Sequence, residues 1–382
     1  MSRLRVGLDV SSAARARGRG IARYVRSLTA ALAALEDGPE AVLFLRNRHF
    51  LRRGHLRGLA PRSPRRWLLG PWGRLGDLDL FHGLGLRLPA RSPVPRLLTL
   101  HDLRGLDGQE WTDARWIRLR SARLRETVAR AEGILCPTAW GRERLFHFFP
   151  DFPRERSAVV PLGVDLERFR PADPEEARRV LARHGVDRPF LLQVGHLNVH
   201  KNPETVLEAF AGSGAAAAGH LLVFVGGAAP DYRPRFEEAV RRNPAHGQVR
   251  WIPEVPAADL PSFYTLAELV LFPSLYEGFG LPVLEAQACG AAGLVSDRPP
   301  LAEVAGEAWP AVPALDAEAW RRALDRMLVD AALLESSRRR SLERAPRFAW
   351  ERIARETLAV QEALARGRPL PSPGLGPAPD GG

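Results

Sequence analysis

Two glutamates with seven residues between them, Glu277 and Glu285, are the groups in this 382-residue sequence best placed to do chemistry together. Gly278 and Gly280 follow the first glutamate, and Pro282 opens a stretch typical of a helix. The first turn of a helix leaves backbone N–H groups unpaired and carries a partial positive charge. Glycines before such a turn let the backbone approach a phosphate closely, so this segment predicts an anion site.

The two carboxylates must then bind something other than the anion, since like charges repel. A carboxylate can accept hydrogen bonds from both hydroxyls of a vicinal diol, as at the ribose of a nucleotide. One carboxylate on a ribose and another on a hexose, with a diphosphate between them, describes a nucleotide sugar. The simpler alternative for Glu285 is a carboxylate in the first helical turn that only interacts with the helix dipole.

A positive charge for the diphosphate is available from Lys201, the single lysine among 55 basic residues. A compact, flexible ammonium binds differently from the planar guanidinium of arginine. Lys201 follows an apolar run, Phe190–Val194, that closes on Gly195 and is typical of a buried strand. Ligands of open α/β sheets bind at the carboxyl ends of strands, so the sequence places Lys201 at a ligand-facing edge.

The elements that would position these residues alternate between strand and helix throughout the chain, which predicts parallel sheets with crossover helices. The first half has predicted strands at Leu4–Val10, Ala41–Leu45, Leu78–His82, Arg96–Leu100, Gly133–Cys136 and Ser157–Pro161, and helices at Ile21–Leu35, Trp116–Ala131 and Ala139–Phe148. The second half has predicted strands at Phe190–Val194, His220–Val225, Val249–Trp251, Leu269–Phe272 and Ala292–Ser296, and helices at Pro174–His184, Pro203–Ala211, Tyr232–Arg242, Leu260–Leu266 and Pro282–Cys289.

We therefore predict two Rossmann-like domains, residues 1–165 and 166–348. An amphipathic helix at about 349–366 follows the second domain, and residues 369–382 are Pro/Gly-rich and predicted to be disordered. Cys136 and Cys289 suggest neither a disulfide framework nor a metal site. With no apolar run long enough for a signal peptide or a membrane span, the expected location is the cytoplasm.

A net charge of +11 could indicate nucleic acid, an anionic membrane surface or anionic substrates. No nucleic-acid-binding motif is visible in the sequence, so a nucleic-acid partner is not predicted. The arginine-rich stretch Arg115–Arg130 is interpreted as a solvated helix face, with docking on anionic lipid as the alternative. Asp77-Leu78-Asp79 resembles a metal-binding pair of aspartates, but its place before an apolar run favours the start of a strand.

Several stretches together resemble the retaining glycosyltransferases of family 4, whose motif has two glutamates with seven residues between them. The matching stretches are Gly18–Tyr24, Thr99–Leu103, Val160–Asp165 and Ser274–Pro282. The resemblance covers roughly residues 5 to 365 and is strongest to bacterial mannosyltransferases of surface-polysaccharide synthesis. It implies the α/β GT-B fold, with two Rossmann-like domains facing across a cleft and a carboxyl-terminal helix that returns to the first domain.

The same resemblance implies a role for each matching residue. Lys201 would bind the diphosphate, Glu277 the sugar hydroxyls and Glu285 the ribose, while Gly195 would border the donor. The further residues implied are Gly278, Phe279, Gly280 and Leu281 as backbone contacts to phosphate, Gly18, Arg19 and Gly20 as contacts to phosphate or acceptor, and His101 with Asp102 at the sugar.

The resemblance also implies a hexosyltransferase that needs no metal and no cofactor. Its donor would be GDP-mannose first and a UDP-hexose second, and its acceptor a saccharide or a polyprenyl-linked saccharide. Peripheral contact with the inner face of an anionic membrane would suit the positive charge. The competing hypothesis is a basic, non-catalytic pair of Rossmann domains that binds an anionic surface or nucleic acid. A dinucleotide oxidoreductase is excluded because no GxGxxG fingerprint follows the first strand.

Overall fold

The computed structural model describes residues 3–14, 20–46, 56, 58–68, 75–107 and 114–371. The chain divides into two compact units. The amino-terminal unit comprises Met1–Gly163 together with Phe348–Gly382, and the carboxyl-terminal unit comprises Val164–Arg347. Each unit is built on its own sheet.

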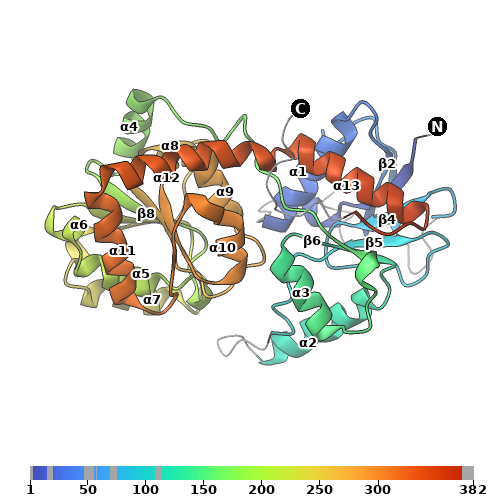
Figure 1. The fold of residues 1–382 in the computed structure, drawn as a ribbon, viewed down its shortest axis with the longest axis horizontal. Coiled ribbons are helices and arrows are strands. Elements are labelled where there is room, and N and C mark those ends of the chain that lie inside the picture. The colour runs from blue at the N-terminus through green and yellow to red at the C-terminus, as the bar shows by residue number, and fades with distance from the viewer. Residues whose placement is uncertain are drawn as a thin grey trace. The chain divides into compact units, whose positions relative to one another are not determined.

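The sheet of the amino-terminal unit has the strand order β3-β2-β1-β4-β5-β6-β7, and its neighbouring strands pair in parallel (Figure 1). The strands are β1 (Arg5–Asp9), β2 (Glu40–Arg46), β3 (Arg65–Leu68), β4 (Leu80–Gly83), β5 (Arg96–Thr99), β6 (Gly133–Cys136) and β7 (Ser157–Val159). The helices are α1 (Gly20–Ala34), α2 (Ala114–Val128), α3 (Ala139–Phe148) and, after the other unit, α13 (Trp350–Ala365).

Helices cover both faces of this sheet because side chains alternate between the faces along each strand. One core joins Ile134 of β6 to Leu124 of α2 and Leu145 of α3. On the opposite face, α13 packs closely on Gly133, where a Cβ atom would lie 2.8 Å from the Leu364 side chain. Helix α13 also packs against α1 on this face.

A buried chain of hydrogen bonds ties α13 to the strands. The Gln361 Nε2 atom lies 3.0 Å from His82 Nδ1, and His82 Nε2 lies 2.9 Å from Thr99 Oγ1. The Thr99 hydroxyl in turn lies 3.0 Å from the hydroxyl of Tyr24 on α1. Burial lowers the pKa of His82 to about 3, with a smaller contribution from His101, so this imidazole is neutral. Burial also raises the pKa of Tyr24.

The sheet of the carboxyl-terminal unit has the order β10-β9-β8-β11-β12-β13, again parallel. Its strands are β8 (Phe190–Val194), β9 (Leu221–Val225), β10 (Val249–Ile252), β11 (Leu269–Phe272), β12 (Gly293–Ser296) and β13 (Ala311–Val312). Its helices are α4 (Pro174–Arg183), α5 (Pro203–Ala211), α6 (Gly214–Ala217), α7 (Arg233–Arg242), α8 (Leu260–Leu266), α9 (Leu281–Ala288), α10 (Pro299–Ala305), α11 (Ala317–Val329) and α12 (Ala331–Arg344).

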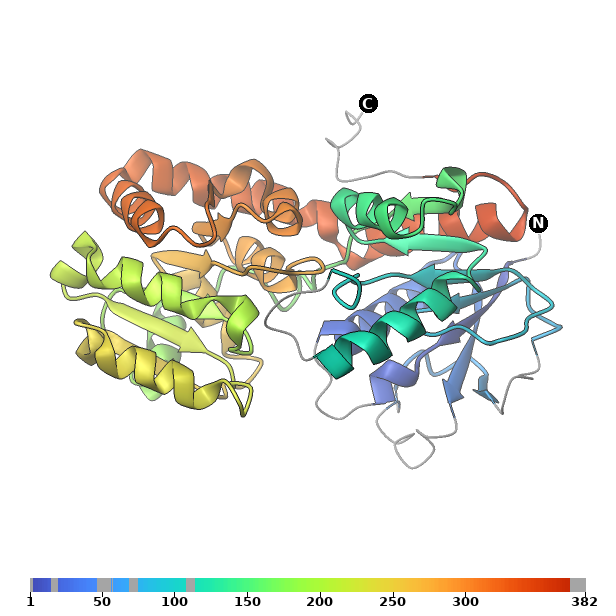
Figure 2. The same ribbon diagram turned by 90° about the horizontal axis from the view of Figure 1, so that it is seen from below.

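Helices lie on both sides of this second sheet as well (Figure 2). The face covered by α5, α7 and α11 holds a hydrophobic core in which Phe210, Phe236 and Trp320 pack on the strands. The alternating pattern read from the sequence therefore predicted the architecture correctly, and two Rossmann-like domains are confirmed.

The elements missing from the prediction are β3, β13 and the helices α6 and α10 to α12. Strand β3 lies at the edge of its sheet and begins with two arginines, so it lacks the apolar run of a central strand. Strand β13 has only two residues.

The predicted disorder from Pro369 onward begins too early. Leu370 is buried and its backbone N–H donates to the Glu155 carbonyl at 2.8 Å. Residues 372–382 lie outside the described part of the chain. Within the described part, no helix combines the length and the apolar character that a membrane crossing requires.

Candidate active site

Lys201 and Glu277 meet at the carboxyl ends of two neighbouring strands, β8 and β11. The Lys201 Nζ atom donates to Glu277 Oε1, which joins residues 76 positions apart in the chain. The two side chains are only 14% and 16% exposed. The loops after adjacent parallel strands meet at one edge of a sheet, and the sequence placed both residues on such loops.

Gly195, which directly follows β8, provides the surface on which Lys201 lies. A Cβ atom at Gly195 would lie 3.6 Å from Lys201 Cε. Gly226, at the end of the adjacent strand β9, has φ +128°, and a Cβ there would lie 2.2 Å from the Gly195 carbonyl oxygen. Only glycine permits this approach, so the backbone ends of β8 and β9 pack directly beside the lysine.

The loop of Gly278, Phe279 and Gly280 leads into α9. Gly280 has φ +115° and serves as the N-cap residue, with no side chain capping the first turn. Helix α9 begins at Leu281 and ends at Ala288, one residue earlier at each end than predicted. Pro282 has no N–H, and the Val283 N–H donates to the Gly280 carbonyl at 2.9 Å. An anion at this turn would therefore meet the Leu281 N–H and the positive end of the helix dipole.

Glu285 is the fifth residue of α9 and is 4% exposed. Tyr264 of α8 donates its hydroxyl to Glu285 Oε2 at 3.4 Å. The first turn of α9 contains no acidic residue, so the interpretation of Glu285 as a first-turn dipole carboxylate is wrong. The nearby Cys289 thiol has a raised pKa, chiefly because it is buried and secondarily because of the Glu285 charge.

In the amino-terminal unit, His101 follows β5 and lies edge-on against the ring of Tyr24, with 4.7 Å between ring centroids. Its Nε2 atom lies 2.9 Å from the Leu84 carbonyl oxygen, to which it donates. Burial lowers the pKa of His101. A neutral imidazole that donates from Nε2 keeps an acceptor lone pair on Nδ1.

Asp102, beside His101, is held by an ion pair. Both of its carboxylate oxygens accept from Arg120 Nη2, at 3.0 and 2.9 Å, and the Arg104 backbone N–H also donates to it. Gly20 is the first residue of α1, the helix that carries Tyr24. Gly18 and Arg19 lie outside the described residues.

The Asp77–Asp79 pair opens β4. Arg66 donates to both oxygens of Asp77 and lowers the pKa of its carboxyl to about 2. Asp79 accepts from the Arg5 backbone N–H at 2.8 Å. Among the described residues, no group of three or more His, Cys, Asp or Glu side chains is arranged to hold a metal ion.

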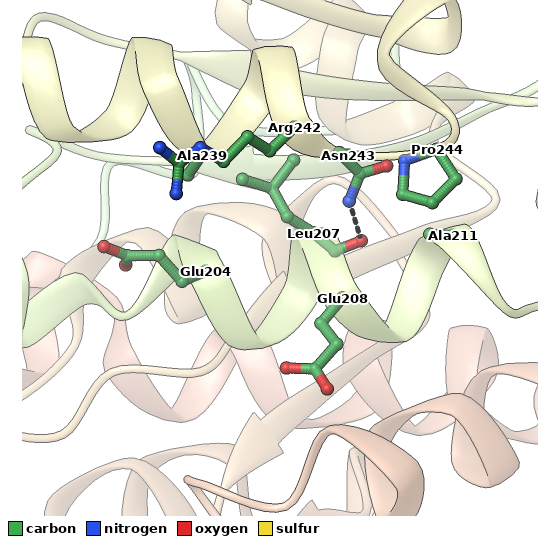
Figure 3. A pocket seen from close by; sticks show the side chains of 8 residues that line it. All are labelled: Glu204, Leu207, Glu208, Ala211, Ala239, Arg242, Asn243 and Pro244. Atoms are coloured by element: carbon green, nitrogen blue, oxygen red, sulfur yellow. Dashed lines mark hydrogen bonds between the residues drawn. The ribbon is translucent and has the colours of Figure 1, made fainter.

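A surface hollow of about 390 Å³ lies on the same unit as Lys201 but on other elements (Figure 3). Its lining comes from α5, α7 and the turn after α7. The lining residues are Glu204, Leu207, Glu208, Ala211, Ala239, Arg242, Asn243 and Pro244, and none of them was predicted as a site residue.

The residue that sequence reasoning missed is Asn202, which has a left-handed backbone conformation and bonds to two other loops. An Asn-Pro pair directly after the single lysine was the available signal, since this dipeptide marks a turn.

Comparison with known proteins matches both halves of the chain to glycosyltransferase families. Residues 18–168 match "Glycosyltransferase Family 4", and residues 175–346 match "Glycosyl transferases group 1". The O-antigen chain mannosyltransferase B of Escherichia coli is 27% identical over 286 residues, covering 75% of this chain and 74% of that protein. The D-inositol 3-phosphate glycosyltransferase 1 of Catenulispora acidiphila is 30% identical over 342 residues, covering 82% and 79%.

Solved structures of other proteins have a similar fold. The structure of HepE from Anabaena in complex with UDP and glucose superposes with a TM-score of 0.75 at 15% sequence identity, covering 95% of this chain and all of that one. The similarity in fold extends over nearly the whole chain, as the two family matches do together. This chain therefore belongs to the group 1 glycosyltransferases and has their GT-B fold.

Proposed function

We propose that this glycosyltransferase moves a hexose, with mannose as the first candidate, from a nucleotide-diphosphate sugar to a saccharide or lipid-linked saccharide. The observation that carries the proposal is the meeting of Lys201 and Glu277 on the loops after β8 and β11. A cation, a carboxylate and an uncapped helix N-terminus are the groups that a diphosphate sugar requires.

Each group has a place in the proposed reaction. Lys201 and the N-terminal end of α9, through the Leu281 N–H and the helix dipole, bind the diphosphate and stabilise the negative charge that develops on it as the glycosidic bond breaks. Glu277 accepts hydrogen bonds from sugar hydroxyls, and Glu285 accepts them from the ribose. His101 contacts the sugar as a neutral imidazole, consistent with its lowered pKa.

The proposed outcome is retention of the anomeric configuration without a metal ion. Charge stabilisation by Lys201 and helix α9, together with orientation of the reactants, would supply the catalysis. The mannose assignment is supported by the Escherichia coli relative, which is an O-antigen chain mannosyltransferase. A UDP-hexose remains the second donor candidate, supported by the HepE complex with UDP and glucose.

The acceptor is proposed to bind the amino-terminal unit, near His101. The net charge of +11 and the exposed arginines Arg118, Arg123 and Arg125 of α2 would favour peripheral contact with an anionic membrane that carries a lipid-linked acceptor. The proposed location is accordingly the cytoplasm, at the inner membrane face.

Thermal unfolding of the purified protein with GDP-, UDP-, ADP- and dTDP-sugars, in EDTA, tests the donor assignment. One nucleotide should raise Tm selectively, and the shift should disappear in Glu285→Gln. Glu208→Gln, an exposed carboxylate on α5, is the control and should keep the shift. If no nucleotide sugar changes Tm and no sugar is transferred, the proposed function is wrong.

Product analysis tests the mechanism. NMR of the product should show the anomeric configuration of the donor, and the rate in EDTA should equal the rate with Mg²⁺ or Mn²⁺. Lys201→Ala should lower kcat by about 10²–10³-fold, the usual cost of losing a group that stabilises developing charge. An inverted product or a strict metal requirement would contradict the mechanism.

A further inference from the structure

Asn202, the residue after Lys201, connects the lysine turn to two other loops of the same unit. Its Nδ2 atom donates to the Pro273 carbonyl at 3.1 Å and to the Ala314 carbonyl at 2.7 Å. Its Oδ1 atom accepts from the Thr205 hydroxyl at 2.9 Å. Pro273 directly follows β11, and Ala314 follows β13. The side chain is 6% exposed, and both of its amide protons are used.

The backbone of Asn202 is held in an uncommon conformation. It has φ +50° and ψ +46°, in the left-handed region, and it precedes Pro203, the first residue of α5. A side chain disfavours this region, and a following proline further restricts the residue before it. Asparagine tolerates the left-handed region better than other residues with a Cβ, and here its side-chain bonds fix it there.

The chain on either side of Asn202 is also bonded to the surrounding structure. The Leu275 backbone N–H donates to the His200 carbonyl at 2.8 Å, and the Gln193 side chain donates to the Lys201 carbonyl at 3.0 Å. Leu275 lies two residues before Glu277. The lysine turn and the glutamate loop are thus joined through the residue before Lys201 and the residue after it.

We propose that Asn202 is a positioning residue that sets the Lys201 ammonium for the diphosphate of the donor. This inference rests on the proposed function, in which Lys201 binds that diphosphate. Lys201 has a long, flexible side chain, so only a fixed backbone defines where its ammonium can reach. The Asn202 side chain fixes that backbone to the loop that carries Glu277 and to the end of β13.

The test compares Asn202→Gly with Asn243→Ala. Glycine keeps the left-handed conformation and removes only the side chain. Asn243 is also a buried asparagine, and its Nδ2 donates to the Leu207 carbonyl at 2.7 Å (Figure 3). Among the described residues, its side chain bonds to Leu207 and Ala245 and not to Lys201 or Glu277. Its φ of −72° suits alanine. Asn202→Gly removes three side-chain hydrogen bonds and Asn243→Ala removes two, at different places in the same unit.

Calorimetry with UDP, GDP, ADP and dTDP, each compared with its own nucleoside, gives the deciding readout. A residue that acts through Lys201 affects binding of the diphosphate and spares the nucleoside. Asn202→Gly should weaken binding of the recognised diphosphate about tenfold and change nucleoside binding less than about twofold. Asn243→Ala should lower Tm because it also loses buried hydrogen bonds, but it should change neither affinity.

A double-mutant cycle shows whether the effect passes through the lysine. In the Lys201→Ala background, Asn202→Gly should cause no further loss of diphosphate affinity. Thr205→Val, which removes only the bond to Asn202 Oδ1, should cause a smaller loss in the same direction. It serves as the milder variant should Asn202→Gly fold poorly.

The outcomes separate the two proposals. If Lys201→Ala weakens diphosphate binding while Asn202→Gly and Thr205→Val do not, Asn202 has no positioning role and the donor site stands. Equal losses of diphosphate and nucleoside in Asn202→Gly would likewise overturn the positioning role. If Lys201→Ala leaves diphosphate affinity unchanged, or the wild-type protein binds none of the four nucleoside diphosphates, the proposed function itself fails.

Discussion

At the scale of single residues, Lys201 and Glu277 form an ion pair whose two charges cancel. Each group neutralises the other before a ligand arrives, and both are shielded from water. In the proposed function, a diphosphate would therefore compete with Glu277 for the ammonium. The carboxylate then becomes available for neutral hydroxyls, which is the role proposed for it.

Replacing Glu277 by glutamine separates its effect on diphosphate binding from its effect on sugar transfer. Glu277→Gln should bind UDP or GDP several-fold more tightly, because Lys201 no longer has a charged partner within the protein. It should also lower kcat for sugar transfer by about 10²-fold or more, since an amide binds the sugar hydroxyls differently. Calorimetry and initial rates measure the two quantities. Unchanged or weaker diphosphate binding would show that the ion pair does not restrain the lysine.

Residue types and spacing predicted that Lys201 and Glu277 lie on loops at strand ends, where the structure has them, but they did not predict the contacts of Asn202. Lys201, Glu277 and the glycines are recognisable because their chemistry suits an anion and sugar hydroxyls. The side chain of Asn202 bonds to carbonyls 71 and 112 residues away, and backbone carbonyls are the same in every sequence. The amino-acid sequence therefore does not indicate which carbonyl groups this side chain will meet.

At the scale of elements, α13 is attached to its sheet by a buried polar contact as well as by apolar packing. Gln361 reaches the fully buried His82 of β4, which also bonds to Thr99 of β5. The sequence indicated an amphipathic helix here, but it did not show that a glutamine would lie on the buried face. His82 opposite gives the Gln361 Nε2 a hydrogen-bond partner in that buried position.

The neutral state of His82 predicts a pH dependence of stability. Its pKa is about 3 in the folded protein and near 6.5 when unfolded, so the unfolded state binds the extra proton between those values. The contribution to stability is complete above pH 6.5 and is lost as the pH falls. Between pH 8 and pH 5 this group should cost about 2 kcal/mol.

Calorimetric unfolding of wild type and His82→Gln from pH 5 to pH 8 measures this contribution. The variant should be less stable at pH 8 but should lose less Tm on acidification. His147→Gln, an exposed histidine on α3, is the control and should keep the wild-type slope. Identical slopes for wild type and His82→Gln would refute the prediction.

At the scale of the whole molecule, the amino-terminal unit is formed by two segments that are separated in the sequence. The second of these segments begins at Phe348 and contains α13. In the sequence, α13 therefore comes after the whole carboxyl-terminal unit. Trp350 at the start of α13 packs on Gly163, where a Cβ atom would lie 2.5 Å from its ring. Ile353, Val360 and Leu364 bury the apolar face of the helix.

Truncation tests this division. A chain ending at residue 347 should keep the unfolding transition of the carboxyl-terminal unit and lose that of the amino-terminal unit, because α1 and the sheet would expose the apolar surface that α13 covers. A chain ending at residue 371 retains all of α13 and should unfold like wild type. Scanning calorimetry of both chains decides. Two wild-type transitions in the shorter chain would show that α13 is dispensable.

The sequence by itself determined the two alternating α/β halves, the strand ends that carry Lys201 and Glu277, and the glycine loop before α9. These features are local, because hydrophobic periodicity and turn residues report which face of a segment is buried and where it ends. The tertiary structure alone decided that the lysine and the glutamate form an ion pair, that Asn202 joins their loops, and that Gln361 meets His82. Those contacts depend on which strands are neighbours and how helices pack on them, and that is set by the assembled core rather than by any one segment.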